Sequence, residues 1–97
     1  LMGFSRGAED AVIAREESAL SSQVEDRVMI MNIDTGTYYE IDKSAARIWD
    51  MLEEPKSFGE ICDALCKAYE VERSQCGSDT SRFVEEMKDL GLLRVDS

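Results

Sequence analysis

Three cysteines are the side chains best suited to do chemistry in this chain. Cys62 and Cys66 stand four residues apart on one expected helix, and Cys76 follows beyond the end of that helix. Thiolates bind soft metals and attack electrophiles, so a metal site and nucleophilic catalysis are the two chemistries to weigh. The chain has no histidine, no Cys-x-x-Cys pair and an odd number of cysteines. This pattern favours part-buried thiols that pack as small hydrophobic groups in a reducing compartment, with no metal and no cofactor.

Acidic side chains offer a second chemistry, general acid and base catalysis. The pairs Glu53-Glu54 and Glu85-Glu86 are candidates, but a chain with 21 acidic residues contains such pairs by chance. Without histidine, a cysteine nucleophile would need a lysine or a helix N-terminus to activate it. The glycines that could have formed a phosphate-binding loop stand isolated, at Gly36, Gly59, Gly77 and Gly91. We therefore predict no catalytic residues and a protein that is not an enzyme.

Length and charge limit the partners. The 97 residues allow one small domain, and no apolar run approaches the roughly 20 residues that cross a bilayer. The formal net charge of −10 would repel a nucleic-acid backbone. The first residues contain no apolar run typical of a secretion signal. We expect a flexible segment at 1–10, a domain at 11–97, and a cytoplasmic protein that binds neither nucleic acid nor membrane.

Strand patterns dominate the first half. We expect strands at 11–15, 27–33 and 37–41, with a short polar passage at 19–24. Asp34-Thr35-Gly36 forms the turn of a hairpin, in which glycine takes a positive φ, so the strand at 37–41 pairs antiparallel with the one at 27–33. The strand at 27–33 then lies between those at 11–15 and 37–41. The strand at 37–41 keeps one edge free.

Helix signals fill the second half. Asp42 caps a first helix that ends before Pro55, and Ser57 with Glu60 forms a capping box for a second. A third helix begins near Ser74, is weakened around Gly77, and ends at a C-terminal cap. The apolar stripes of the first two helices are Ala45, Ile48, Trp49 and Leu52, then Phe58, Ile61, Cys62, Leu65 and Tyr69.

These elements predict an α+β fold, a three-stranded antiparallel sheet followed by a three-helix, winged-helix-like bundle. Gly91 is the expected cap of the last helix, and residues 92–95 add only a short apolar tail. Topology of this kind assigns no function by itself.

A free strand edge indicates binding. Unpaired amide and carbonyl groups along 37–41 can accept another peptide as an added strand. Tyr38 and Tyr39 point to opposite faces of the strand, so one ring can enter the core while the other lies near the edge. Two interpretations of these rings remain, a direct contact with a ligand and a purely structural cover for a thin sheet.

From about Val12 to Val95 the chain resembles the PqqD-like family, the peptide-recognition elements used to make ribosomally synthesised, post-translationally modified peptides. In size and in its Glu53-Glu54-Pro55 helix exit it looks most like the free-standing leader-binding proteins of lasso-peptide gene clusters. The resemblance rests on the order and spacing of Gly36, Tyr38-Tyr39, Ile41-Asp42, Ala46-Arg47-Ile48-Trp49, Leu52, Ile61, Leu65, Phe83, Met87, Leu90 and Gly91-Leu92-Leu93.

The resemblance implies that a disordered leader peptide adds as a strand beside 37–41, in a groove bounded by the third helix. Gly77 and Ser78 predict an irregular upper wall for that groove. Asp79 and Glu86 either recognise a lysine or arginine of the leader or are simply solvated. The implied peptide-binding residues are Thr37, Tyr38, Tyr39, Glu40, Ile41, Gln75, Asp79, Arg82, Phe83 and Glu86.

The resulting hypothesis is a non-catalytic protein that captures a precursor peptide and delivers it to a modifying enzyme, preferably the leader peptidase of lasso-peptide biosynthesis. One alternative is a PqqD-type chaperone that presents its peptide to a radical SAM enzyme. Another is a winged-helix DNA-binding regulator, but residues 74–90 carry only Arg82 and Lys88 against four acids. A third is a subunit of a metal or redox enzyme that uses the cysteines. We expect a monomer or weak dimer.

Overall fold

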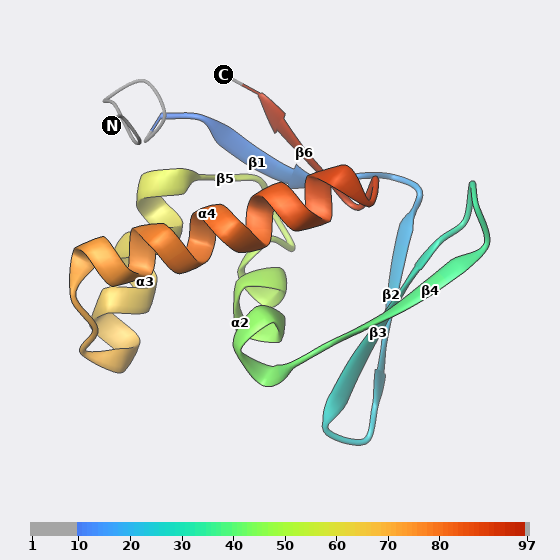
Figure 1. Cartoon of the computed structure of the whole chain (residues 1–97), viewed down its shortest axis with the longest axis horizontal. Helices are drawn as coiled ribbons and strands as arrows, with labels where there is room; N and C mark the ends of the chain where they lie inside the picture. The colour runs from blue at the N-terminus through green and yellow to red at the C-terminus, as the bar shows by residue number, and fades with distance from the viewer. Residues whose placement is uncertain (1–9, 97) are drawn as a thin grey trace.

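The computed structural model describes residues 10–96 of the chain. Within them the chain forms three helices and two three-stranded antiparallel sheets, in the orders β2-β3-β4 and β5-β1-β6 (Figure 1). The elements are β1 (Val12–Arg15), β2 (Ala19–Val24), β3 (Arg27–Asn32), β4 (Thr37–Ile41), α2 (Lys43–Met51), β5 (Lys56–Ser57), α3 (Phe58–Tyr69), α4 (Arg73–Asp89) and β6 (Leu93–Asp96). The predicted α+β class, with three helices after an antiparallel three-stranded sheet, is confirmed. Apart from Asp10, the segment predicted to be flexible lies outside the described residues.

The β3–β4 hairpin forms where the sequence predicted it. Asn32 organises its turn, because the Oδ1 atom of Asn32 accepts from the amide of Asp34 at 2.9 Å and its carbonyl accepts from Gly36 at 2.7 Å. Gly36 has φ +74°, the left-handed conformation that favours glycine. The side chain of Asn32 also donates to the carbonyl of Leu90 at 3.1 Å, so this hairpin is tied to the C-terminal end of α4.

Three assignments in the strand regions were wrong. Residues 19–24 are not a polar passage but β2, which pairs with β3 over its whole length. An edge strand open to solvent tolerates the polar run Ser21, Ser22 and Gln23, which masks the strand signal. The strand predicted at 11–15 does form, as β1. Its expected place beside β3 is taken by β2, and β1 pairs instead with β5 and β6 in the second sheet. The segment expected as an apolar tail is β6.

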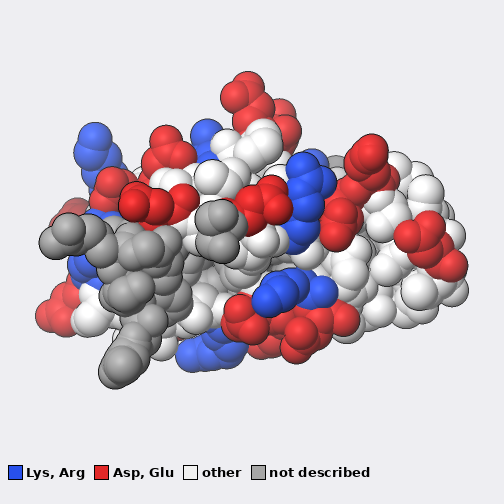
Figure 2. Space-filling model, turned by 90° about the horizontal axis from the view of Figure 1, so that it is seen from above, with Lys and Arg blue, Asp and Glu red and all other residues white. Residues whose placement is uncertain are grey.

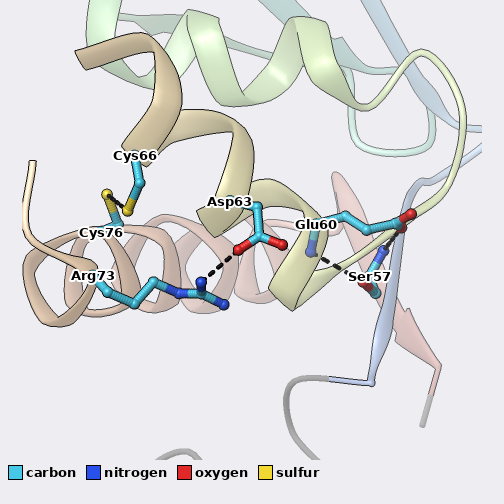
Figure 3. A network of polar contacts seen from close by, with 6 residues as sticks. All are labelled: Ser57, Glu60, Asp63, Cys66, Arg73 and Cys76. Carbon is cyan, nitrogen blue, oxygen red and sulfur yellow. Dashed lines mark hydrogen bonds and ion pairs between the residues drawn. The ribbon is translucent and has the colours of Figure 1, made fainter. Parts of the chain in front are cut away.

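Local capping explains where the helices begin. The carboxylate of Asp42 accepts from the amide of Ala45 at 2.8 Å at the start of α2. At the start of α3 the Ser57 hydroxyl accepts from the amide of Glu60 at 3.1 Å, and the Glu60 carboxylate accepts from the amide of Ser57 at 2.8 Å (Figure 3). The hydrogen bond from the Ser57 backbone lowers the pKa of Glu60 below its usual value. Both predicted caps are confirmed.

Helix α4 is continuous through Gly77, contrary to the predicted irregular wall. Glycine costs about 1 kcal/mol in a helix interior, but the buried side chains of Cys76, Thr80 and Val84 hold this helix against the core. At its end, Gly91 donates to the carbonyl of Lys88, and Leu92 donates to that of Met87. These two bonds are the Schellman pattern, and Gly91 takes φ +76°, as expected for the cap. The chain therefore reverses and runs back as β6 beside β1.

One apolar core holds the two sheets and the helices together. Val28 and Ile30 on the inner face of β3 pack in the same cluster as Ile13 of β1 and Trp49 of α2. The Arg15 guanidinium lies over the Trp49 ring, 4.4 Å from its centroid, and donates to the Trp49 carbonyl at 2.6 Å. Figure 1 shows the β2-β3-β4 sheet at one end of the molecule, with α3 and the start of α4 at the other.

Two glycine substitutions, one within α4 and one just beyond its C-terminal end, test the assigned cap. An alanine at position 91 would have to keep the positive φ of Gly91, and its Cβ atom would lie 3.0 Å from the side-chain amide nitrogen of Asn32. Gly91→Ala should therefore destabilise the fold by about 1–2 kcal/mol. Gly77 has helical backbone and no atom within 4 Å of an added Cβ, so Gly77→Ala should stabilise the fold by about 0.5–1 kcal/mol. Urea unfolding measures both. Equal effects of the two substitutions would contradict the assigned cap.

Candidate functional site

The outer edge of β4 is open along its length. β4 is the last strand of its sheet, and no other strand of residues 10–96 pairs with it on that side. Two hydrogen bonds establish which of its backbone groups face outward. The amide of Ile33 donates to the Ser18 carbonyl at 2.9 Å, so Ile33 faces β2, and the carbonyl of Asn32 accepts from Gly36, so Asn32 faces β4.

Backbone direction alternates from one residue to the next along an antiparallel strand. Because Asn32 lies opposite Thr37, the backbone groups of Thr37, Tyr39 and Ile41 point to β3. Those of Tyr38 and Glu40 point away from it. The free edge therefore presents two N–H donors and two carbonyl acceptors, which are the groups that an added strand would bind.

Side chains of β4 divide between the two faces of the sheet. Ile41 is buried and Tyr39 is half-buried against the core, whereas Tyr38 is 65% exposed on the opposite face. The predicted division of the two tyrosines is therefore present, one against the core and one near the edge. Glu40 is exposed and forms an ion pair with Arg27 of the neighbouring strand at 3.2 Å.

A groove of about 350 Å³ begins where β4 ends. Its floor and walls come from the start of α2 and from one side of α4, and Asp42 joins it directly to the last residue of the strand. The α4 positions follow the spacing i, i+3, i+4 and i+7, which keeps them on one helical face. The lining residues are Asp42, Ser44, Ala45, Ile48, Asp79, Arg82, Phe83 and Glu86.

Four of the five α4 positions named from the sequence line this groove, namely Asp79, Arg82, Phe83 and Glu86. Gln75 does not line it. Its side chain instead donates to the Asp79 carboxylate at 3.0 Å, one helical turn further on. The structure thus brings these four residues together beside the end of β4, and a role in peptide binding remains a prediction for each of them and for Gln75.

An adjoining hollow of about 170 Å³ was not predicted from the sequence, and it shares Ser44, Ile48 and Asp79 with the groove. It adds Arg47, whose guanidinium lies 4.4 Å from the centre of the Tyr69 ring. The spacing of Ser44, Arg47 and Ile48 on one face of α2 was the signal that could have identified this wall. Leu65, Val71 and Cys76 complete the hollow.

Charge in the groove is mainly negative. Asp79 has one cationic neighbour, Arg82, at 3.7 Å, while Glu86 has no ion pair among the described residues. On the face shown in Figure 2, acidic side chains cover more of the surface than basic ones, and the end formed by the β2-β3-β4 sheet is largely uncharged. This distribution suits a peptide with a basic side chain more than an anionic ligand.

A larger hollow, about 440 Å³, lies elsewhere. It is lined by Phe58 and Cys62 of α3 and by a different face of α4, around Gly77. Its lining includes neither a residue of β4 nor Asp42, so it is not joined to the outward-facing backbone of Tyr38 and Glu40. Within residues 10–96 no three side chains of the metal-binding types are grouped to hold a metal, and no helix there is long and apolar enough to cross a membrane.

The sequence profile described as "Coenzyme PQQ synthesis protein D (PqqD)" matches residues 27–93, from β3 into β6. The chain belongs to the PqqD family. The resemblance seen in the sequence is therefore confirmed, and the part of the PqqD fold that is matched includes the β4 edge and all of α4. No protein with curated function matches the chain.

Two solved structures are similar to this PqqD-family chain. One is described as "TbiB1 in Complex with the TbiA(beta) Leader Peptide", with 33% identity and a TM-score of 0.78, and the match covers 84% of this chain and 94% of that one. The other, "Lasso peptide synthetase B1 complexed with the leader peptide", has 22% identity and a TM-score of 0.76, with 84% and 96% covered. At its lower identity, the second supports the fold alone.

Amide hydrogen exchange tests the assigned register of β4. The amides of Tyr38 and Glu40 face solvent, so they should exchange at least about tenfold faster than those of Tyr39 and Ile41, which donate to β3. The measurement is two-dimensional NMR of the isolated protein after transfer to deuterated water. Slow exchange at Tyr38 and Glu40 with fast exchange at Tyr39 would show that the register is shifted by one residue.

Proposed function

We propose that this protein binds the leader segment of a ribosomally made precursor peptide as an added strand on β4 and does not itself catalyse a reaction. The observation that carries the proposal is the open edge of β4, with the backbone of Tyr38 and Glu40 directed outward beside the α4 groove. The similar solved structure at 33% identity, described as a complex with a leader peptide, supports it.

Main-chain bonds supply part of the affinity. Each backbone hydrogen bond contributes about 0.5–1.5 kcal/mol net, whereas ordering a disordered segment costs about 2–5 kcal/mol or more. Bonds to Tyr38 and Glu40 alone therefore leave little net affinity. The peptide also needs an apolar side chain to bury, and Ala45, Ile48 and Phe83 provide apolar surface in the groove.

Selection among peptides comes from the side chains beside the strand. The carboxylates of Asp79 and Glu86 line the groove, and Arg82 offsets only the first of them. A leader with a lysine or arginine close to its apolar anchor is the chemical class that fits this lining. A leader rich in acids is repelled by the groove and by the net charge of −10.

Delivery follows from binding. A protein that holds the leader leaves the rest of the precursor accessible, and association with an enzyme then raises the local concentration of substrate without new chemistry. We assign that enzyme to the class of leader peptidases of lasso-peptide biosynthesis, and the protein to the cytoplasm as a monomer or weak dimer. The leader peptide and this enzyme are its partners, with no nucleic acid and no membrane.

A proline scan of the sheet edges tests strand addition. Glu40→Pro removes one outward N–H donor of β4. The probe is a fluorescently labelled peptide, the leader of the precursor encoded beside the gene for this protein. The substitution should weaken its binding at least about tenfold. Ser21→Pro removes an outward N–H from β2, the opposite edge of the same sheet, and should leave the affinity within about twofold. Fluorescence anisotropy measures both.

Two further readouts make this test decisive. Glu40→Ala keeps the amide and loses only the exposed ion pair with Arg27, so its affinity should stay within about threefold of wild type. Circular dichroism establishes that each variant is folded. Equal losses for Glu40→Pro and Ser21→Pro, or full binding by a folded Glu40→Pro, would rule out addition to β4.

A charge pair on α4 tests the side-chain selection. Glu86→Gln removes a carboxylate from the groove, and its affinity for a leader that contains lysine should fall about two- to fivefold at low salt. Glu85→Gln makes the same change on the neighbouring position, which lines a different hollow near β1, and should have no effect. Binding that weakens equally in both variants would indicate only a general effect of net charge.

A further inference from the structure

Two thiols meet where α3 ends and α4 begins. The Sγ atom of Cys66, in the last turns of α3, lies 3.2 Å from that of Cys76, in the first turn of α4 (Figure 3). The Cys66 thiol donates a hydrogen bond to the Cys76 sulfur. Cys66 is partly exposed, whereas Cys76 is only 3% exposed. The pair therefore joins a thiol that small reagents can reach to a buried thiol in direct contact with it.

We propose that Cys66 and Cys76 form a reversible redox site, in which a small-molecule disulfide such as oxidised glutathione converts the two thiols to an intramolecular disulfide between α3 and α4. Contact between the sulfur atoms means that little backbone movement is needed to form the bond. Nothing in the peptide-binding role requires this chemistry, so the site stands independently of the proposed function.

The exchange takes two steps, and exposure fixes their order. The Cys66 thiolate attacks one sulfur of oxidised glutathione, which forms a mixed disulfide and releases one glutathione thiolate. The Cys76 thiolate then attacks the Cys66 sulfur and expels the second glutathione thiolate. Two protein thiols are oxidised, one disulfide of glutathione is reduced to two thiols, and the two protons lost by the cysteines pass to those thiols or to solvent.

The buried partner makes the second step dependent on pH. Burial is the main cause that raises the pKa of Cys76 to about 11, and the neighbouring Cys66 contributes less. Only a small fraction of Cys76 is therefore thiolate near neutral pH. As long as the pH stays below the pKa, that fraction increases about tenfold with each unit by which the pH is raised. The second step, in which the disulfide between Cys66 and Cys76 forms, should therefore become faster as the pH increases.

The disulfide would add a covalent link at the first turn of α4, where Cys76 already packs in the core. Glu72, the N-cap of α4, makes no side-chain capping bond, and an exposed ion pair joins Arg73 at the start of α4 to Asp63 in the middle of α3 (Figure 3). Cys76 also lines the smaller hollow that adjoins the groove. Oxidation would therefore fix the first turn of α4 and with it one wall of that hollow.

Redox titration of the full chain tests the proposal. Wild-type protein equilibrated in oxidised and reduced glutathione, alkylated and digested with trypsin and Asp-N should yield one disulfide that links the peptides of Cys66 and Cys76. Asp-N cleavage before Asp63 separates Cys62 from Cys66, so the pairing is unambiguous. The oxidised form should melt about 10 °C higher than the reduced form, and dithiothreitol should reverse this shift.

The variant Cys66→Ser supplies the matched control, because it changes the partly exposed thiol and leaves the buried ones in place. It should show no intramolecular disulfide and no redox-dependent melting shift, while its melting temperature in reducing buffer stays close to that of wild type. A wild-type disulfide through Cys62, a glutathione adduct on Cys66 that never closes, or no oxidation in the most oxidising buffer would each overturn the proposal.

Discussion

The unpaired backbone of one edge strand is the constraint on which the rest of this structure depends. The amide and carbonyl groups of Tyr38 and Glu40 face away from β3, so only water or another chain can satisfy them. Other features of the fold fix the surroundings of this edge. Asn32 ties the β3–β4 hairpin to the C-terminal end of α4, and Asp42 starts α2 directly after the strand. The edge is thereby held beside a groove rather than left on an open surface.

Much of this arrangement could be predicted, because its signals are local. The hairpin turn, the Asp42 cap, the capping box at Ser57 and the glycine cap at Gly91 are each encoded within a few residues, and all four form. Of the α4 positions that the resemblance implied, Asp79, Arg82, Phe83 and Glu86 share one helical face and line the groove, whereas Gln75 does not. Resemblance to the PqqD family supplied the link between this face and β4, which no local pattern contains.

The errors concern partners distant in sequence. β1 and β6 are separated by most of the chain, so nothing near residues 11–15 reveals that they pair with residues 93–96. A polar run concealed β2, because an edge strand needs few apolar side chains. Tertiary packing kept α4 regular through Gly77, where propensity alone predicted a break. Arg47 and Tyr69 meet across α2 and α3, a contact that depends on how those helices pack.

The most direct test of the central claim is an NMR measurement of the bound complex, with isotope-labelled protein and an unlabelled leader peptide. Cross-strand nuclear Overhauser effects should connect the amide protons of Tyr38 and Glu40 to the peptide backbone, and none should reach the outer edge of β2. Peptide contacts confined to side chains, or contacts that lie along β2, would contradict strand addition at β4.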